Sequence, residues 1–200
     1  MVVPEPRRKV PVAWDEGWWR PARRSPSPNQ GERPAGLAVD LVVLHSISLP
    51  PGCYGGPEVE DLFLNRLDTT RDPQLAALAG LTVSAHFFIR RDGECVQFVP
   101  VHRRAWHAGV STFQGRPACN DFSVGIELEG LEGRTFERRQ YGVLTQLLKA
   151  LRQVLPLRAV TGHEHIAPDR KRDPGPGFDW VGLRRQLRWS PARFPDVPTA

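Results

Sequence analysis

The chain has 200 residues, 40% of them hydrophobic and 24% charged, and at this length a folded domain removes roughly 70% of its unfolded surface from water without needing disulfide staples. Three widely spaced cysteines with no Cys-x-x-Cys pair argue against a disulfide framework or a cysteine zinc knuckle and favour a reducing compartment. The net charge of +5 raises nucleic acid as a partner, but the arginines are scattered in pairs without a nucleic-acid motif, so we expect a solvated basic surface and no nucleic-acid partner.

The N-terminal segment, residues 1–36, is rich in Pro, Arg, Ser and Gly and carries three tryptophans, Trp14, Trp18 and Trp19. We expect an irregular arm that places aromatic rings on the domain, with residues 1–13 as an extension outside it. No apolar segment follows the first basic residues, and the Arg7-Arg8 pair is followed by prolines and charges where a twin-arginine signal requires an apolar stretch. No window approaches the roughly 18 apolar residues of a membrane span. We therefore expect a cytoplasmic protein with no membrane partner.

The run LAVDLVVL, residues 37–44, is almost continuously apolar and too short for a typical helix. It predicts a strand buried on both faces, with His45 at its C-terminal tip. Open sheets with helices place ligands at such tips. Farther along, residues 57–67 begin with a proline and acidic residues, which predicts a helix.

Residues 84–91 and 94–99 flank Asp92-Gly93 and predict a β-hairpin with a two-residue turn. The segment FSVGIELE, residues 122–129, alternates strictly between apolar and small or polar side chains. It predicts a strand whose polar face carries both Glu127 and Glu129.

From Thr135, expected as the helix cap, apolar residues recur at helical spacing up to Pro156 and predict a helix that packs on the sheet. A short strand near Val160, a loop rich in Pro and Gly, and a last helix from Asp179 to about Trp189 follow. Residues 191–200 are expected as a flexible tail. The chain therefore predicts a single α/β domain over residues 14–190, with a mixed central β-sheet flanked by helices on both sides.

Two histidines and an aspartate are placed to share a metal ion. His45 ends one predicted strand, His163 follows another, and Asp173 lies in the loop Arg-Asp-Pro-Gly-Pro-Gly, where prolines and glycines fix an irregular backbone. Two imidazoles and one carboxylate leave the fourth tetrahedral position open, the pattern of catalytic zinc sites. The spacing alone is weak evidence for a metal site, because a single histidine is more often a surface or hydrogen-bonded core residue than a metal ligand.

Several ordered motifs together resemble a known family, the zinc-dependent N-acetylmuramoyl-L-alanine amidases. The resemblance is closest to the cytosolic AmpD branch, which hydrolyses 1,6-anhydro-N-acetylmuramyl peptides during cell-wall recycling; peptidoglycan recognition proteins are more distant. It covers roughly residues 14–190. The motifs that carry it are VVLHSISLPPG (42–52), SAHFFIRRDGECVQFVP (84–100), RAWHAGVSTFQGR (104–116), CNDFSVGIELEG (119–130) and TGHEHIAPDRKRDPGPGFDW (161–180).

The resemblance implies the roles of individual residues. The family's zinc ligands fall on the same trio, with one Zn²⁺ per chain, in a cleft at the edge of the sheet. Its catalytic glutamate falls on Glu127 and its basic loop residue on Lys171. Residues expected to contact substrate are Ser46, Trp106, His107 and Arg116.

Other residues of the same types are expected to be structural. His102 is expected at the surface, His165 facing away from the metal, and His86 and Glu129 in structural positions. His107 is expected to shape the cleft beside Trp106 and not to bind metal. Ser46 stands where close relatives carry Asn, and Ala118 where Arg is common, which puts a substrate contact in doubt but not the metal.

The implied function is a monomeric, zinc-dependent amidase that cleaves the bond between the lactyl group and L-alanine in anhydromuramyl peptides. Three alternatives remain open. An amidase that acts on intact peptidoglycan is the main one. A non-catalytic muropeptide sensor would be favoured by a lost metal ligand, and nucleic-acid binding would show salt-dependent retention on DNA.

Overall fold

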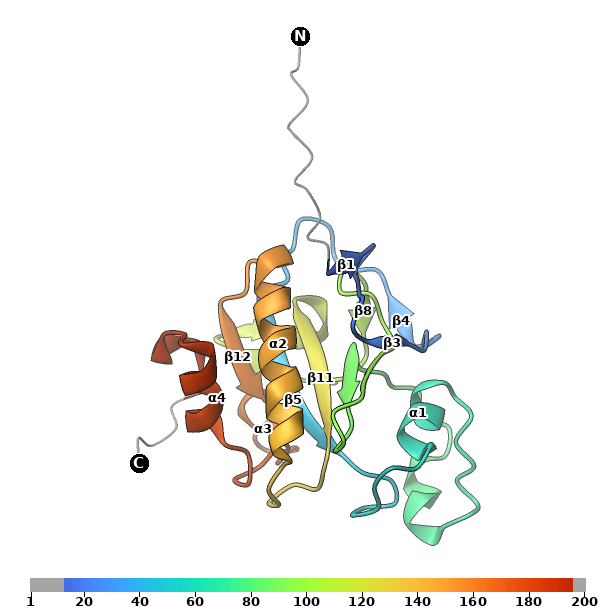
Figure 1. Cartoon of the computed structure of the whole chain (residues 1–200). Coiled ribbons are helices and arrows are strands. Elements are labelled where there is room, and N and C mark those ends of the chain that lie inside the picture. Colours follow the sequence, from blue (N-terminus) through green and yellow to red (C-terminus); the bar gives the residue numbers. More distant parts are fainter. Residues whose placement is uncertain (1–12, 196–200) are drawn as a thin grey trace.

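Six strands form the central sheet of the structure, a computed structural model that describes residues 13–195 (Figure 1). They lie in the order β12-β5-β11-β6-β7-β3. The bounds are β3 Arg23–Arg24, β5 Leu41–Ile47, β6 Phe87–Ile89, β7 Cys95–Gln97, β11 Ser123–Glu129 and β12 Ala159–Gly162. Strands β12, β5, β11 and β6 pair in parallel, β7 is antiparallel to β6, and β3 is parallel to β7. The predicted single α/β domain with a mixed sheet is confirmed.

The remaining elements are short, apart from one long helix. Three two-stranded sheets are β1 (Trp14–Asp15) with β2 (Trp18–Trp19), β4 (Gln30–Gly31) with β8 (Arg104–Ala105), and β9 (Thr112–Phe113) with β10 (Arg116–Pro117). The α-helices are α1 Glu58–Phe63, α2 Arg138–Val154, α3 His163–Ile166 and α4 Trp180–Leu187. The 3-10 helices are Pro73–Leu78, Cys119–Asp121 and Pro191–Arg193. Within residues 13–195, no helix has the length and apolar character needed to cross a bilayer.

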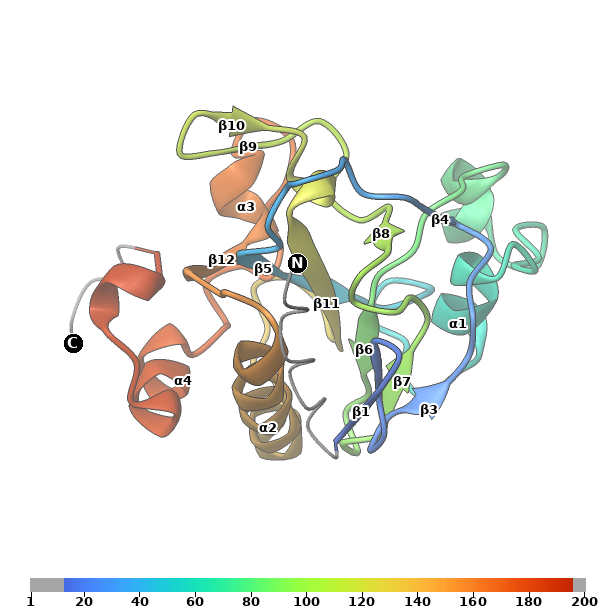
Figure 2. The ribbon, with the colours of Figure 1, turned by 90° about the horizontal axis from the view of Figure 1, so that it is seen from above.

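Helices cover both faces of the sheet, as predicted. Viewed from above, α2 and α4 lie on one side of it, and α3 with β9 and β10 lies on the other (Figure 2). The alternation in β11 sends Val124, Ile126 and Leu128 toward α2, where they join its leucines in the largest core cluster. The opposite face of β11 is therefore turned toward α3 and the loops beside it, which is where the polar residues of this strand lie.

This packing makes the core of α2 sensitive to truncation. Leu148 is fully buried in the cluster, so Leu148→Ala is expected to lower the free energy of unfolding by about 2–5 kcal/mol through lost transfer energy and a residual cavity. Denaturant unfolding measures it. Leu81→Ala is the matched control, because Leu81 is 44% exposed, and equal losses in the two variants would contradict the packing described.

Strand β5 differs in its limits from the predicted strand at 37–44. Its neighbours set these limits, because β11 pairs with it from Ser123, opposite Leu41, to Glu129, opposite Ile47. The predicted start was therefore wrong by four residues. His45 lies inside the strand, two residues before its end, and not just beyond it.

The hairpin exists, but its turn is longer than predicted. Gly93 N–H donates to the Arg90 carbonyl at 3.0 Å and Arg90 N–H donates to Glu94 O at 2.8 Å, so residues 91–93 form a three-residue loop. Gly93 takes a positive φ of 96°, as such loops require. The Asp92 carboxylate accepts Glu94 N–H at 2.8 Å, a contact that stabilises this loop.

Two helix boundaries also differ. Thr135 does not cap α2: Glu137 N–H donates to the Gln140 side-chain oxygen at 2.9 Å, and the helix begins at Arg138. Helix α1 ends at Phe63 and not near residue 67. Asn65 there has a φ of 58°, a left-handed conformation that asparagine tolerates but a helix does not.

The structure describes parts of the predicted N-terminal arm and of the predicted C-terminal tail. Trp14 and Trp19 are buried in the main core cluster, as expected for an arm that packs aromatic rings on the domain. Residues 1–12 of the predicted extension and 196–200 of the predicted tail lie outside the described residues. In the described part of the tail, Pro191–Arg193 forms a 3-10 helix, and the Arg193 guanidinium donates to the Leu157 carbonyl.

Candidate metal centre and active site

Three predicted ligands converge on the face of the sheet opposite α2. The Nδ1 atoms of His45 and His163 are 3.0 Å apart, and Asp173 Oδ2 lies 3.0 Å from the first and 3.2 Å from the second. His45 is on β5, and His163 begins α3 directly after β12, whose last residue pairs with Leu44. Parallel pairing of β5 and β12 thus brings two histidines that are 118 positions apart in the sequence to one point.

The loop after α3 brings the carboxylate to the same point. The Asp173 carbonyl accepts the N–H of Glu164 at 2.9 Å, which ties the loop to the first turn of α3. A side chain at Gly162 would place its Cβ 2.8 Å from Pro174 Cδ. A glycine at the end of β12 is therefore what allows this loop to approach the strand.

The donor set and its spacing fit a tetrahedral metal ion. Metal–nitrogen and metal–oxygen bonds of about 2.0–2.1 Å place tetrahedral ligands roughly 3.3 Å apart, close to the distances above. Burial lowers the pKa of His45 to about 4, although the hydrogen bond with Asp173 raises it. Burial alone would raise the pKa of Asp173, but its close contacts with the His163 and His45 rings outweigh the effect of burial and lower that pKa. Neutral imidazoles and an ionised carboxylate are the forms that bind zinc.

Glu127 lies beside this cluster with an unsatisfied oxygen. It pairs in register with His45 on the neighbouring parallel strand, so both side chains occupy the same face. Glu127 is 8% exposed, and its Oε2 has no hydrogen-bond partner among residues 13–195. Burial raises the pKa of Glu127 well above its usual value, and the charge of Asp173 raises it further, against a smaller opposing effect of Lys171. A buried carboxyl with a raised pKa is suited to accept and return a proton near neutral pH.

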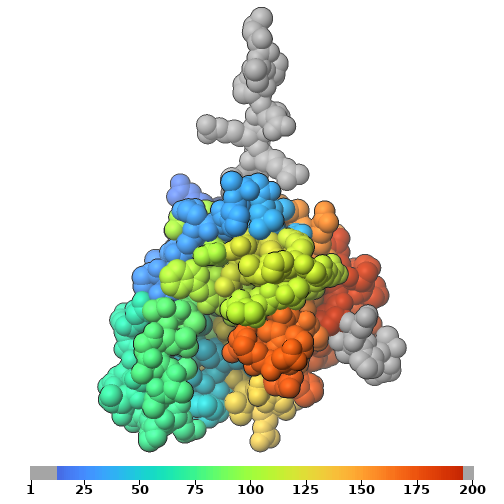
Figure 3. Space-filling model, turned by 180° about the vertical axis from the view of Figure 1, so that it is seen from behind, coloured from blue at the N-terminus to red at the C-terminus, as the bar shows by residue number. Residues whose placement is uncertain are grey.

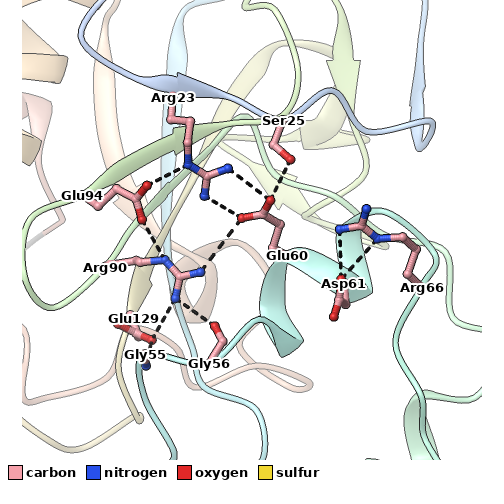
Figure 4. A network of polar contacts seen from close by, with 10 residues as sticks. All are labelled: Arg23, Ser25, Gly55, Gly56, Glu60, Asp61, Arg66, Arg90, Glu94 and Glu129. Carbon is pink, nitrogen blue, oxygen red and sulfur yellow. Dashed lines mark hydrogen bonds and ion pairs between the residues drawn. The ribbon is translucent and has the colours of Figure 1, made fainter.

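Glu129 shares the polar face of β11 but is fully engaged in the network of Figure 4. Its carboxylate accepts the backbone N–H of Gly55 at 2.5 Å and of Arg91 at 3.0 Å, and the Arg90 guanidinium lies 3.7 Å away. These contacts join the end of β11 to the loop before α1 and to the hairpin. Glu129 is thus placed as a structural residue, in contrast to Glu127.

A cleft of about 470 Å³ opens beside the cluster. Lys171 and Asp173 line one wall, and Ser46 with the residues that follow β5 lines another. In Figure 3 the orange surface around residue 170, the blue surface after β5 and the yellow surface near residue 130 meet at this place. Ser46 and Lys171 therefore both face a space next to the candidate metal centre.

One predicted substrate contact, Arg116, is placed away from the three ligands. Arg116 donates to both oxygens of Asp40 at 3.0 Å and stacks on Phe122. Asp40 precedes β5 at the end opposite His45, so the structure does not bring Arg116 to the cluster. Trp106 is half-buried and its indole lies near Gly31 of β4.

The other histidines occupy the positions expected of them. His102 is exposed. His165 Nδ1 accepts the N–H of Gly162 at 3.0 Å, and its ring packs edge-on against Trp180. His86 is fully buried and accepts the N–H of Gly125 at Nδ1.

Contacts to His107 are the part of the site that the sequence did not indicate. His107 Nδ1 lies 3.0 Å from His45 Nε2, and its Nε2 lies 3.2 Å from Ser123 Oγ. Asn120 Oδ1 accepts the N–H groups of His107 and Ala108. The alternation of β11 already placed Ser123 on the same face as Glu127, and this was the one available signal.

Comparisons with known proteins give a consistent result. Residues 35–176 match the model of the N-acetylmuramoyl-L-alanine amidase family. The chain is 52% identical over 172 residues to the 1,6-anhydro-N-acetylmuramyl-L-alanine amidase AmpD of Citrobacter freundii, which covers 85% of this chain and 92% of that protein.

Solved structures give the same picture. A crystal structure of a selenomethionine derivative of AmpD superposes with a TM-score of 0.84 at 50% identity, over 86% of this chain and 98% of that one. The amidase AmiD from Escherichia coli, solved with the substrate anhydro-N-acetylmuramic acid-L-Ala-D-gamma-Glu-L-Lys, superposes with a TM-score of 0.55 at 28% identity, over 79% of this chain and 65% of that one.

Proposed function

The chain belongs to the N-acetylmuramoyl-L-alanine amidase family, of the AmpD type, and we propose that it is a zinc-dependent amidase that hydrolyses the lactyl–L-alanine bond of 1,6-anhydro-N-acetylmuramyl peptides. The observation that carries the proposal is the convergence of His45, His163 and Asp173 beside the buried carboxyl of Glu127, whose Oε2 has no hydrogen-bond partner in the described residues 13–195. The bond named for AmpD and the anhydromuramyl peptide bound by AmiD support the choice of substrate.

The three ligands would hold one zinc ion with an open fourth position. When bound, zinc supplies a Lewis acid that polarises the scissile carbonyl and lowers the pKa of a coordinated water to about 7. Glu127 accepts the proton of the attacking water and returns it to the leaving amine of L-alanine. Its Oε2 makes no hydrogen bond to residues 13–195, so this oxygen is available for both transfers.

Lys171 stabilises the oxygen that gains charge as the carbonyl is attacked. Its charge lowers the pKa values of Glu127 and His45, and it lines the cleft. Muropeptide stems carry several carboxylates, and the net charge of +5 favours their approach. Ser46 and Trp106 remain proposed contacts for the sugar and peptide, His107 remains proposed to shape the cleft beside Trp106, and Arg116 is proposed for a stem carboxylate that extends to its end of β5.

Lys171→Met tests the role of the lysine. Because the ammonium acts on charge that develops during the reaction, kcat is expected to fall by about 10²–10³-fold with little change in KM. Steady-state kinetics measures both. Lys149→Met on the exposed face of α2 is the matched control. A raised KM with an unchanged kcat would instead make Lys171 a binding residue.

We also propose that the reaction belongs to peptidoglycan recycling and takes place in the cytoplasm. All three cysteines are free, which suits a reducing compartment. Mass spectrometry of the protein incubated with anhydromuramyl tripeptide, with intact sacculi in parallel, tests the substrate. Anhydro-sugar and free peptide from the soluble substrate alone are expected. Release of peptide from sacculi alone would assign the protein to wall hydrolysis. No product from either substrate, in protein verified to hold zinc, would favour a non-catalytic muropeptide sensor.

A further inference from the structure

In both histidine ligands, the ring nitrogen that faces away from the cluster contacts one of two adjacent residues, His107 or Ala108. His45 Nε2 lies 3.0 Å from His107 Nδ1, and His163 Nε2 lies 3.2 Å from the carbonyl oxygen of Ala108. A carbonyl oxygen only accepts, so His163 Nε2 carries the proton and its Nδ1 presents a lone pair to the cluster. The segment His107–Ala108 thus contacts the far nitrogen of each ligand.

The direction of the hydrogen bonds behind His45 follows from Ser123. Its hydroxyl has one proton, which it donates to the Cys119 carbonyl at 2.6 Å. Its oxygen therefore accepts from His107 Nε2–H at 3.2 Å. A neutral imidazole has one donor and one acceptor, so His107 Nδ1 accepts from His45 Nε2–H, and His45 Nδ1 is left with the lone pair that the zinc site needs.

The surroundings of His107 hold its ring in this position. Asn120 Oδ1 accepts both backbone N–H groups of the segment, at 3.1 Å from His107 and 2.8 Å from Ala108. A Cβ on Gly125 would lie 2.4 Å from the His107 ring, so only glycine leaves room for it. Ser123, Gly125 and Glu127 share one face of β11. On this face Ser123 orients the His107 ring, Gly125 leaves room for it, and Glu127 supplies the reactive carboxyl.

We propose that His107 is a positioning residue which, with Ser123 behind it, fixes His45 in the Nε2–H tautomer that directs Nδ1 to the metal. The inference rests on the proposed zinc site. Partners of this kind behind a metal-binding imidazole typically account for 10–100-fold in metal affinity. Neither residue coordinates the metal or touches the reacting atoms.

Two variants of His107 separate orientation from packing. His107→Leu fills a similar volume but accepts no hydrogen bond, and is expected to weaken zinc binding by about 10–100-fold in competition with a chromophoric chelator. His107→Asn restores an acceptor close to the Nδ1 position and is expected to recover most of the affinity. His102→Leu, at an exposed histidine, is the matched control and should bind zinc like the parent. Equal zinc affinity in parent and in folded His107→Leu would overturn the proposal.

The tautomer is read directly in metal-free protein by long-range ¹H–¹⁵N NMR of labelled histidines. His45 is expected with its proton on Nε2, and this preference should weaken in His107→Leu and in Ser123→Ala. A parent protein with the His45 proton on Nδ1 would overturn the proposal. Should His107→Leu fail to fold, Ser123→Ala decides, because it removes only one hydroxyl. A parent that binds no zinc would contradict the proposed function instead, so the two failures are distinguishable.

Discussion

Asp173→Ala is expected to remove zinc from the purified protein and to reduce amide hydrolysis to the level of a buffer control. The substitution takes away one of three ligands and the only carboxylate among them. It leaves two neutral imidazoles, which do not offset the charge of a divalent cation in a buried site. Elemental analysis and a peptide-release assay on the same sample measure the two losses together.

The control for this loss lies in the same loop. Asp169→Ala removes an exposed carboxylate four residues away and should retain both zinc and turnover. His45→Ala and His163→Ala are expected to behave like Asp173→Ala, because each contributes one Nδ1 atom to the cluster. An active variant without bound metal would show that these residues are not the ligands of a catalytic zinc ion.

Glu127→Gln is expected to retain zinc and to lose turnover by about 10²–10⁴-fold. Glutamine preserves the size of the side chain but transfers no proton, which is the contribution a general base makes. Steady-state kinetics and zinc analysis of the same preparation measure the effect. Glu132→Gln, an exposed glutamate near the cleft, is the matched control. Near-normal turnover in Glu127→Gln would mean that another group accepts the proton.

The same substitution is expected to stabilise the metal-free protein at neutral pH. Burial raises the pKa of Glu127 well above its usual 4.5 in the folded chain, so the folded state holds a proton that the unfolded state has released. The stability that this provides is complete below pH 4.5 and is lost as the pH rises through the folded pKa. Glutamine does not titrate, so the variant should exceed the parent in Tm increasingly with pH. A parent Tm that rises with pH relative to the variant would contradict the raised pKa.

The central strands could be read from the sequence because their patterns are local. Strict alternation in β11 gave the face on which Glu127 lies, and the apolar run before His45 gave β5 as a buried strand. The exact first and last residues of β5 could not be predicted in this way, because they depend on its pairing with β11 and β12, which are distant in sequence. The hairpin turn shows the same limit: Asp92-Gly93 indicated a turn, while the bond from Gly93 N–H to Arg90 O made it one residue longer.

The candidate site divides in a similar way. His45 and His163 were indicated by their positions at predicted strand ends, Asp173 by its loop rich in Pro and Gly, and Glu127 by resemblance. Parallel pairing of β5, β11 and β12 brings the two histidines and Glu127 together, and the loop after α3 adds Asp173. The contacts of His107 to His45 and Ser123 depend on how a loop far from β5 in sequence packs onto the sheet, and no spacing in the sequence encodes that. Arg116 was proposed as a substrate contact from the resemblance, whereas its pairing with Asp40 depends on tertiary structure.

The most direct test of zinc-dependent amidase activity is to titrate metal-free protein with zinc and to follow the products from anhydromuramyl tripeptide by mass spectrometry. Hydrolysis is expected to be absent without metal and to rise in proportion to added zinc until one equivalent per chain is bound. Full turnover in protein verified to be free of metal would contradict it.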